Sequence, residues 1–373
     1  MTEPTAILNA ALQRAIANLE EPLLADPEAG ERVEYIARNL TNKAGTRLLM
    51  SCLLAKIHVP AVDIRKPYTQ IGGGDSYSGR KYDELYLTSF IIEHRLPCNS
   101  TTAFLTPALR NRNETLIKGM DLVGRPPQLY AYVLDLLDDV HNDRVAAGAL
   151  LAETIRWLLI VRNEQEQRIE SMIKGLRTTQ GALPLSSEQI VNLVVQHMSL
   201  KNTSRLPVLI VAAAYMAAER HLGERVLTLE AHNAADKQTG ALGDIEITLL
   251  DEDKVVTTYE MKDKRVSRED IDRAIQKLNE TGKRVDNYIF VTTAPIDAEV
   301  QGYAHALYED TDGIEFVILD CIGFLRHYLH LFHRLRAVFL EAYQSLILAE
   351  PISSVGQPVK EAFLSMRQAA ETD

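Results

Sequence analysis

The chain has 373 residues, 46% of them hydrophobic and 24% charged, which allows a large core and two or three domains. Its net charge of -11 argues against a protein that coats nucleic acid nonspecifically, because Lys and Arg neutralise phosphates in that mode of binding. Cys52, Cys98 and Cys321 are far apart and lack zinc-ligand spacing, so neither a disulfide framework nor a structural zinc site is predicted.

The first residues, MTEPTAILNAALQRA, contain no basic region followed by an apolar run. No window approaches the roughly 20 apolar residues that cross a bilayer. We therefore expect a cytoplasmic protein with no membrane partner.

Charge is unevenly distributed along the chain. Residues 1–40 hold seven Asp or Glu against three Lys or Arg, whereas residues 262–284 hold eight Lys or Arg against five Asp or Glu. The second stretch is the better candidate for a nucleic-acid face.

Residues 1–200 are predicted to form a mainly helical region. Apolar spacing indicates helices up to about residue 60 and again over about 126–200. Between them, residues 62–113 are rich in Gly, Arg, Tyr and Thr and in turn signals. We interpret this segment as polar loops that contact DNA.

The pattern after residue 200 alternates between helix and strand, which predicts an α/β domain over 201–325 followed by C-terminal helices over 326–373. Helices are expected near 206–222, 268–282, 297–308 and 322–348. Strands are expected near 225–231, 244–250, 255–262, 287–293 and 314–320.

The chemically informative stretch is GALGDIEITLLDEDKVVTTYEMKDKRV, residues 240–266, which is predicted to form two strands joined by an acidic turn. Strand alternation places Asp244 and Glu246 on one face of the first strand, and Glu260 and Lys262 on one face of the second. The two carboxylates Asp244 and Glu260 and the Lys262 ammonium then share one side of the sheet.

Burial of both apolar faces favours a definite register. The expected pairs are Ile245 with Met261 and Ile247 with Tyr259. Asp244 would then lie opposite Lys262, and Glu246 opposite Glu260. This arrangement requires an odd-length connection, for example one with a bulge, because a two-residue hairpin would split the group across the sheet.

Crowded carboxylates at a strand end resist losing water and repel each other unless a cation compensates. Mg2+ supplies that compensation with one or two protein carboxylates, water and substrate phosphate oxygens. Asp244 and Glu260 are the predicted metal ligands. Lys262 is expected to orient or deprotonate the attacking water.

These residues resemble the PD-(D/E)xK nuclease superfamily over about residues 205–320. Asp244 and Glu260-Met261-Lys262 match its pattern, with Gly243 where Pro is usual. The resemblance implies a mixed α/β fold, with a restriction-endonuclease-like αβββαβ core in the C-terminal half and a largely helical N-terminal region. It also implies an Mg2+-dependent endodeoxyribonuclease with Asp244, Glu260 and Lys262 as catalytic residues.

Many members of the superfamily add a Glu from the preceding helix, which makes Glu219 a candidate catalytic residue. It ends a stripe of helical spacing that runs through Leu209, Ala212 and Met216. The alternative is an exposed Glu219 paired with a neighbouring basic residue.

The segments DIRKPYTQIGGG, SGRKYDE and TTAFLTPALRNRN, with GDIEI and YEMKDKRV, resemble the SacI-type family of type II restriction endonucleases. That resemblance implies a site-specific enzyme that acts on double-stranded DNA as a homodimer. It further implies Mg2+ as cofactor and a DNA methyltransferase that protects the same site.

Several polar side chains are candidates for DNA contacts. Arg can bond bidentately to guanine and Asn to adenine, although half or more of protein–DNA hydrogen bonds go to phosphate and sugar. Lys264 continues the phase of Glu260 and Lys262, and Gln276 lies in the following helix. A surface lysine and a solvated helix flank are the respective alternatives. The remaining candidates are Arg65, Lys66, Arg80, Lys81, Arg110, Asn111 and Arg112.

Three other functions stay open at this point. The first is a repair or defence nuclease that acts on damaged, modified or single-stranded DNA. The second is a catalytically inactive DNA-binding protein with the nuclease fold. The third is a helical adaptor, which requires that the 240–266 register place the charged side chains on different faces.

Overall fold

The computed structural model describes residues 3–39, 41–99, 101–177, 184–227, 229 and 241–372. The chain forms two compact units, Met1–Ile169 and Glu170–Asp373. Within the described ranges, no helix is both long and apolar enough to span a bilayer.

The first unit is helical, as predicted. Its central helix α3 (Ala44–His58) is buried without interruption over residues 44–55, because apolar and small side chains occupy its faces everywhere except at Arg47. The other long helices are α1 (Pro4–Ala17), α2 (Pro27–Arg38), α6 (Pro127–His141) and α7 (Ala147–Arg177), the last of which extends past Ile169. Short helices are η1 (Thr69–Ile71), α4 (Gly79–Tyr82), η2 (Asp83–Leu87), α5 (Thr88–Glu93) and η3 (Ala103–Leu105).

A buried ion pair anchors the polar segment over residues 62–113 to this core. Arg47 of α3 contacts Asp83 at 2.6 Å, and both side chains are fully buried. The Asp83 carboxylate also accepts hydrogen bonds from the Thr102 hydroxyl at 2.5 Å and the Ala103 amide at 2.8 Å. Since a buried charge needs such compensation, the ion pair fixes two parts of the turn-rich segment to one helix.

The second unit combines a sheet with helices from both of its sequence ends. Its boundary differs from the predicted 200/201, because α8 (Ser187–Met198) packs against helices of the C-terminal stretch. The predicted helix over 322–348 is two helices separated by a short 3-10 turn. The helices outside the core motif are α13 (Cys321–Leu331), η4 (His333–Leu335), α14 (Arg336–Ala349) and α15 (Gln357–Thr372).

The sheet has five strands in the order β1-β2-β3-β4-β5. The first three are antiparallel, and the last three are parallel. The strands are β1 (Glu224–Val226), β2 (Ile245–Leu249), β3 (Val255–Lys262), β4 (Asn287–Thr292) and β5 (Glu315–Asp320). With α9 (Leu206–Leu222) before β1 and α11 (Arg268–Thr281) before β4, this is the predicted αβββαβ order, and the mixed fold is confirmed.

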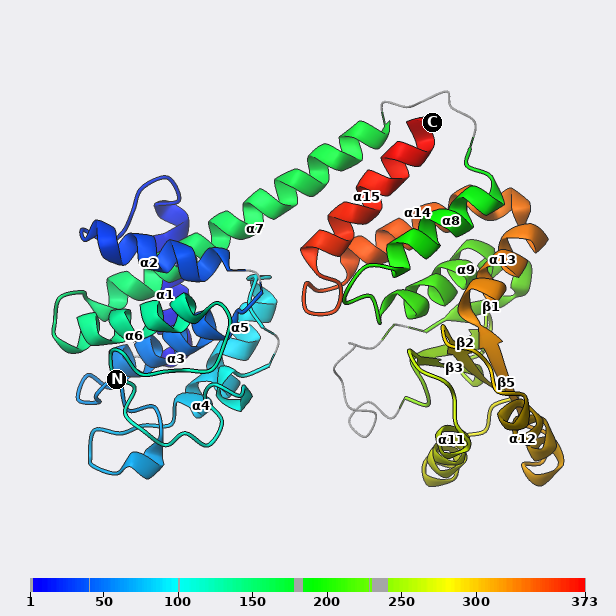
Figure 1. The fold of residues 1–373 in the computed structure, drawn as a ribbon, viewed down its shortest axis with the longest axis horizontal. Coiled ribbons are helices and arrows are strands. Elements are labelled where there is room, and N and C mark those ends of the chain that lie inside the picture. The colour runs from blue at the N-terminus through cyan, green and yellow to red at the C-terminus, as the bar shows by residue number, and fades with distance from the viewer. Residues whose placement is uncertain are drawn as a thin grey trace. The chain divides into compact units, whose positions relative to one another are not determined.

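Helices cover both faces of the sheet (Figure 1). On one face, α11 and α12 (Ala298–Asp310) enclose a core that includes Tyr288, Phe290 and Phe316. On the other, Tyr259 of β3 contacts Tyr215 of α9 through their hydroxyls, 2.9 Å apart. The predicted face of Glu260 and Lys262 is therefore the α11 side of the sheet, because alternation places these side chains opposite Tyr259.

The observed β2–β3 register differs from the predicted one by two residues. Ile245 pairs with Tyr259, and Ile247 pairs with Thr257, so the predicted partners Met261 and Tyr259 were wrong. The odd-length connection and the bulge are present: residues 250–254 join the strands, and the register shifts between Ile247 and Thr248. A shift of two residues preserves the side-chain faces, because strand alternation has period two.

Candidate active site

Asp244 terminates the β2–β3 ladder next to Glu260. Its backbone amide donates to the Tyr259 carbonyl at 2.8 Å. Its carboxylate Oδ2 accepts a hydrogen bond from the Met261 amide at 2.7 Å, beyond the last backbone pair of the β2–β3 ladder, Ile245 with Tyr259. The corrected register therefore brings Asp244 to the backbone between Glu260 and Lys262, instead of placing it opposite Lys262.

Glu260 is a half-buried carboxylate with two partners. Its Oε1 lies 2.9 Å from Nζ of Lys262, and its Oε2 lies 3.3 Å from the Tyr288 hydroxyl. That hydroxyl is also 3.0 Å from the Leu242 carbonyl oxygen. Tyr288 is buried on the neighbouring strand and borders Glu260 from the core side of the sheet, where Leu242 and Glu260 share its single hydroxyl proton.

Lys262 is held between two carboxylates. Its Nζ lies 2.9 Å from Glu260 and 3.6 Å from Oδ1 of Asp270. Burial opposes the charge on Lys262, but attraction to Glu260 and Asp270 outweighs burial and raises its pKa above the ordinary value. Both predicted roles of Lys262, to orient or to deprotonate the attacking water, stay predictions.

Asp270 belongs to this site and was not predicted. Its side chain is fully buried near the start of α11, and its Oδ2 accepts hydrogen bonds from the Ser267 amide at 3.0 Å and hydroxyl at 3.1 Å. Burial alone would raise the pKa of Asp270. Hydrogen bonds from Ser267 and the positive charges of Lys262 and Arg273 outweigh burial, so the pKa of Asp270 is lowered. The Ser267-x-x-Asp270 pattern is a capping box visible in the sequence, but it does not reveal the contact with Lys262.

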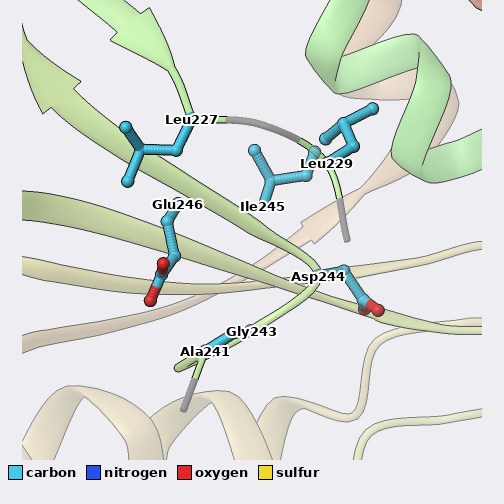
Figure 2. A pocket seen from close by; sticks show the side chains of 7 residues that line it. All are labelled: Leu227, Leu229, Ala241, Gly243, Asp244, Ile245 and Glu246. Atoms are coloured by element: carbon cyan, nitrogen blue, oxygen red, sulfur yellow. The ribbon is translucent and has the colours of Figure 1, made fainter. Parts of the chain in front are cut away.

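A pocket of about 270 Å³ adjoins Asp244. Figure 2 shows that the carboxylates of Asp244 and Glu246 point in different directions from its wall. Glu246 accepts a hydrogen bond from the Leu242 amide at 2.9 Å and lies 3.8 Å from Lys283. The other residues that line the pocket are Leu227, Leu229, Ala241, Gly243 and Ile245.

In the described residues, the contacts of Glu260 are with Lys262 and Tyr288 and do not include Glu219. Glu219 lies on α9, whose Tyr215 contacts the sheet face opposite Glu260, and Met216 of the predicted apolar stripe is 47% exposed. Over the described ranges, no group of three or more His, Cys, Asp or Glu side chains is placed to hold a metal ion. Glu219 follows Tyr215 by one helical turn and is half-buried, and its role as a third acidic group stays a prediction.

One comparison identifies the domain that carries this arrangement. Residues 184–293 match the family model of the SacI restriction endonuclease C-terminal domain. This part of the chain is a SacI-type restriction endonuclease domain. The match includes Asp244, Glu260, Lys262 and Asp270, whereas the N-terminal segments that resemble the same family lie outside it. No curated protein matches the chain.

The two predicted DNA contacts inside the SacI-type domain differ in setting. Lys264 has a side chain that is 63% exposed, with its Nζ 3.9 Å from Asp270, so it extends from the site into solvent. Gln276 is exposed on α11 and donates to Glu280 at 2.7 Å. The structure thus places Lys264 beside the site and Gln276 on a solvated flank, and both DNA contacts stay predictions.

The other predicted DNA contacts lie in the first unit. Arg65 is held by Asp63, Lys66 by Asp75 at 2.7 Å, and Arg112 by the carbonyls of Ala108 and Asp121. These three side chains already serve the local structure. The exposed candidates are Arg80, Lys81, Arg110 and Asn111. Their contact with DNA stays a prediction.

Gly243 is required by close packing at the start of β2. A Cβ atom at this position would lie 2.5 Å from the Tyr259 carbonyl oxygen and 2.7 Å from Oγ1 of Thr258. We expect Gly243→Ala to destabilise the SacI-type domain by about 1–3 kcal/mol, because backbone must move to relieve the overlap. Urea unfolding measures this loss. The matched control is Gly302→Ala, where a Cβ would meet no heavy atom within 4 Å; equal stability of the two variants would contradict the prediction.

Tyr288→Phe tests the hydroxyl that contacts Glu260. We expect divalent-metal affinity to fall about tenfold, because groups that orient a metal ligand typically contribute that much or more. Isothermal titration with Mg2+ measures the affinity. Tyr215→Phe is the control, since its hydroxyl bonds to Tyr259 on the other face of the sheet. A similar loss in both variants would show that Tyr288 acts only through general stability.

Proposed function

We propose that the chain is a site-specific type II restriction endonuclease that hydrolyses phosphodiester bonds of double-stranded DNA with Mg2+ and leaves 5′-phosphates. The observation that carries the proposal is the junction of Asp244, Glu260 and Lys262 at the end of the β2–β3 ladder, in a SacI-type domain. Ion pairs that perturb a lysine cluster at functional sites, so a lysine held between carboxylates at a strand end supports a nuclease over a binding protein or adaptor.

The donor set suits a magnesium ion. Asp244 and Glu260 offer carboxylate oxygens at adjacent positions of neighbouring strands, and Mg2+ is commonly bound through one or two carboxylates with water and phosphate completing its shell. These two residues would hold the ion. When bound, the ion supplies Lewis-acid chemistry and makes water more acidic.

The protein's own groups position the reaction. The Met261 amide orients the Asp244 carboxylate, and the Tyr288 hydroxyl orients Glu260. The Lys262 ammonium, which lies 2.9 Å from Glu260, would stabilise the negative charge that develops on the phosphate oxygens. Water forms a new P–O bond, the P–O3′ bond breaks, and the 3′ oxygen takes a proton, which leaves a 3′-hydroxyl and a 5′-phosphate.

Two partners follow from the proposal. A site-specific nuclease cuts both strands of a duplex, and two copies related by a twofold axis match the symmetry of a palindromic site. We therefore propose a homodimer, which sedimentation with and without duplex DNA can measure. A DNA methyltransferase that modifies the same site would protect the host chromosome.

The decisive experiment incubates the purified chain with long unmethylated duplex DNA, with and without Mg2+, and repeats the incubation with Glu260→Ala. Discrete fragments that require both metal and the unaltered chain, and that carry 5′-phosphates, support the proposal. Cleavage only of damaged, modified or single-stranded DNA would favour a repair or defence nuclease. Intact DNA under every condition, with duplex still bound, would favour an inactive binding protein.

A further inference from the structure

Lys262 contacts one carboxylate that the proposed reaction uses and one that it does not. Glu260 accepts the Lys262 ammonium at 2.9 Å, and Asp270 lies 3.6 Å from it on the other side. Asp270 comes from a different element, the first turn of α11, and its side chain has no exposed surface. A fully buried carboxylate beside a lysine is costly unless it is compensated, so this contact restrains the local structure.

Glu260 cannot bind a divalent metal ion and the Lys262 ammonium equally well at the same time. A carboxylate oxygen that binds a divalent cation loses much of its attraction for an ammonium group, and the ammonium repels the cation. Lys262 must therefore have another acceptor if it is to remain in place and charged once Glu260 becomes a metal ligand. Asp270 is the second carboxylate beside Lys262 in the described structure, and contacts with Ser267 and Arg273 hold it in place.

We propose that Asp270 is a positioning residue that takes over the Lys262 ammonium when Glu260 binds metal. The inference rests on the proposed function, and it adds an exchange of ion-pair partners to it. In the metal-free site Lys262 pairs with Glu260, and in the loaded site it pairs with Asp270. Asp270 touches neither substrate nor metal, and it acts only through Lys262.

The exchange makes Mg2+ affinity depend on Asp270 mainly when Lys262 is present. Without the Asp270 carboxylate, Lys262 keeps Glu260 as its acceptor and competes with the metal ion. Asp270→Asn should therefore weaken Mg2+ binding about tenfold, which corresponds to roughly 1.4 kcal/mol. If Lys262 is absent there is no competitor, so the same substitution should have a several-fold smaller effect.

A double-mutant cycle separates this role from a structural one. Mg2+ affinity is measured by calorimetry in the wild-type chain, Asp270→Asn, Lys262→Ala and the double variant, without DNA and without any activity assay. A loss from Asp270→Asn that is several-fold larger with Lys262 than without it supports the proposal. Equal losses in the two backgrounds would overturn it, because a general charge effect or weakened helix capping acts in both.

A neighbouring acidic residue provides the matched control. Glu269 is exposed in the same first turn of α11, and Glu269→Gln removes one negative charge without a contact to Lys262 in the described structure. Its effect on Mg2+ affinity should be small and the same in both backgrounds. A loss that depends on Lys262 as strongly as that of Asp270→Asn would contradict a specific role for Asp270.

The wild-type chain allows a second measurement if Asp270→Asn does not fold. Side-chain 15N labelling of lysine, with Lys262→Ala for assignment, reports whether the Lys262 ammonium protons are protected from exchange. Protection that persists on saturation with Mg2+ supports the transfer to Asp270. Loss of protection at saturation would overturn it. Failure of the wild-type chain to bind Mg2+ at all would instead contradict the metal site of the proposed function.

Discussion

Glu260→Ala is expected to lower the rate of DNA cleavage by more than about a thousandfold, or more than about 4 kcal/mol in activation free energy. Glu260 contacts both Lys262 and Tyr288, so its loss removes a proposed metal ligand and an acceptor of the lysine together. Single-turnover cleavage of a duplex with one recognised site measures the rate. Binding of the same duplex should change by less than about threefold in Ca2+-free buffer, because positive side chains supply most of the affinity for phosphates.

Asp263→Asn is the matched control for Glu260→Ala. Asp263 is an exposed acidic residue directly after β3, and its substitution removes the same unit of charge from the same end of the sheet. Its cleavage rate should stay within about threefold of the wild-type rate. The assignment of Glu260 as a metal ligand would be wrong if Glu260→Ala cut DNA at the rate of Asp263→Asn.

Lys262→Ala is expected to lower the rate of cleavage by about a hundredfold to a thousandfold, as the loss of one preorganised charge-stabilising donor does in other enzymes. The Lys262 side chain is 18% exposed and its ammonium lies between Glu260 and Asp270, so the ammonium is placed before the substrate arrives. The loss should appear in the rate at saturating DNA and not in the affinity for DNA, because the stabilised charge develops only in the transition state.

Lys264→Ala separates this effect from a loss of general positive charge. Lys264 follows two residues later, shares Asp270 as a neighbour at 3.9 Å, and has a side chain that is 63% exposed. We expect Lys264→Ala to weaken DNA binding and to reduce its salt dependence, with the rate at saturating DNA almost unchanged. Reversed behaviour of the two lysine variants would assign the charge-stabilising role to Lys264.

The αβββαβ order was predictable because segments with helical spacing and segments with strand spacing alternate clearly in the SacI-type domain. The range of β3 over 255–262 and that of α9 over 206–222 agree with the prediction residue for residue. Strand alternation also placed Glu260 and Lys262 on one face correctly. These features depend on neighbouring residues in the chain, so a single sequence contains the information they need.

Pairing and packing across the site were less predictable. The observed β2–β3 register differs from the predicted one by two residues, and alternation cannot detect a difference that preserves the faces. The contact between Lys262 and Asp270 depends on the path of residues 263–267 into α11. The helical stripe that ends at Glu219 allowed two orientations, and the structure turns Tyr215 to the sheet instead of Met216.

The hydrogen bond from the Met261 amide to Asp244 affects the choice of a cleavage-deficient variant for experiments that identify the recognised DNA sequence. The Asp244 side chain is a proposed metal ligand and also accepts the Met261 amide at the end of the β2–β3 ladder, so its removal would loosen the ends of two strands. In an Asp244→Ala protein, the loss of catalysis could therefore not be separated from the loosening of the strand ends. Glu260 accepts no backbone amide in the described structure, so a Glu260→Ala protein is the better bait for capturing uncut DNA from a random library.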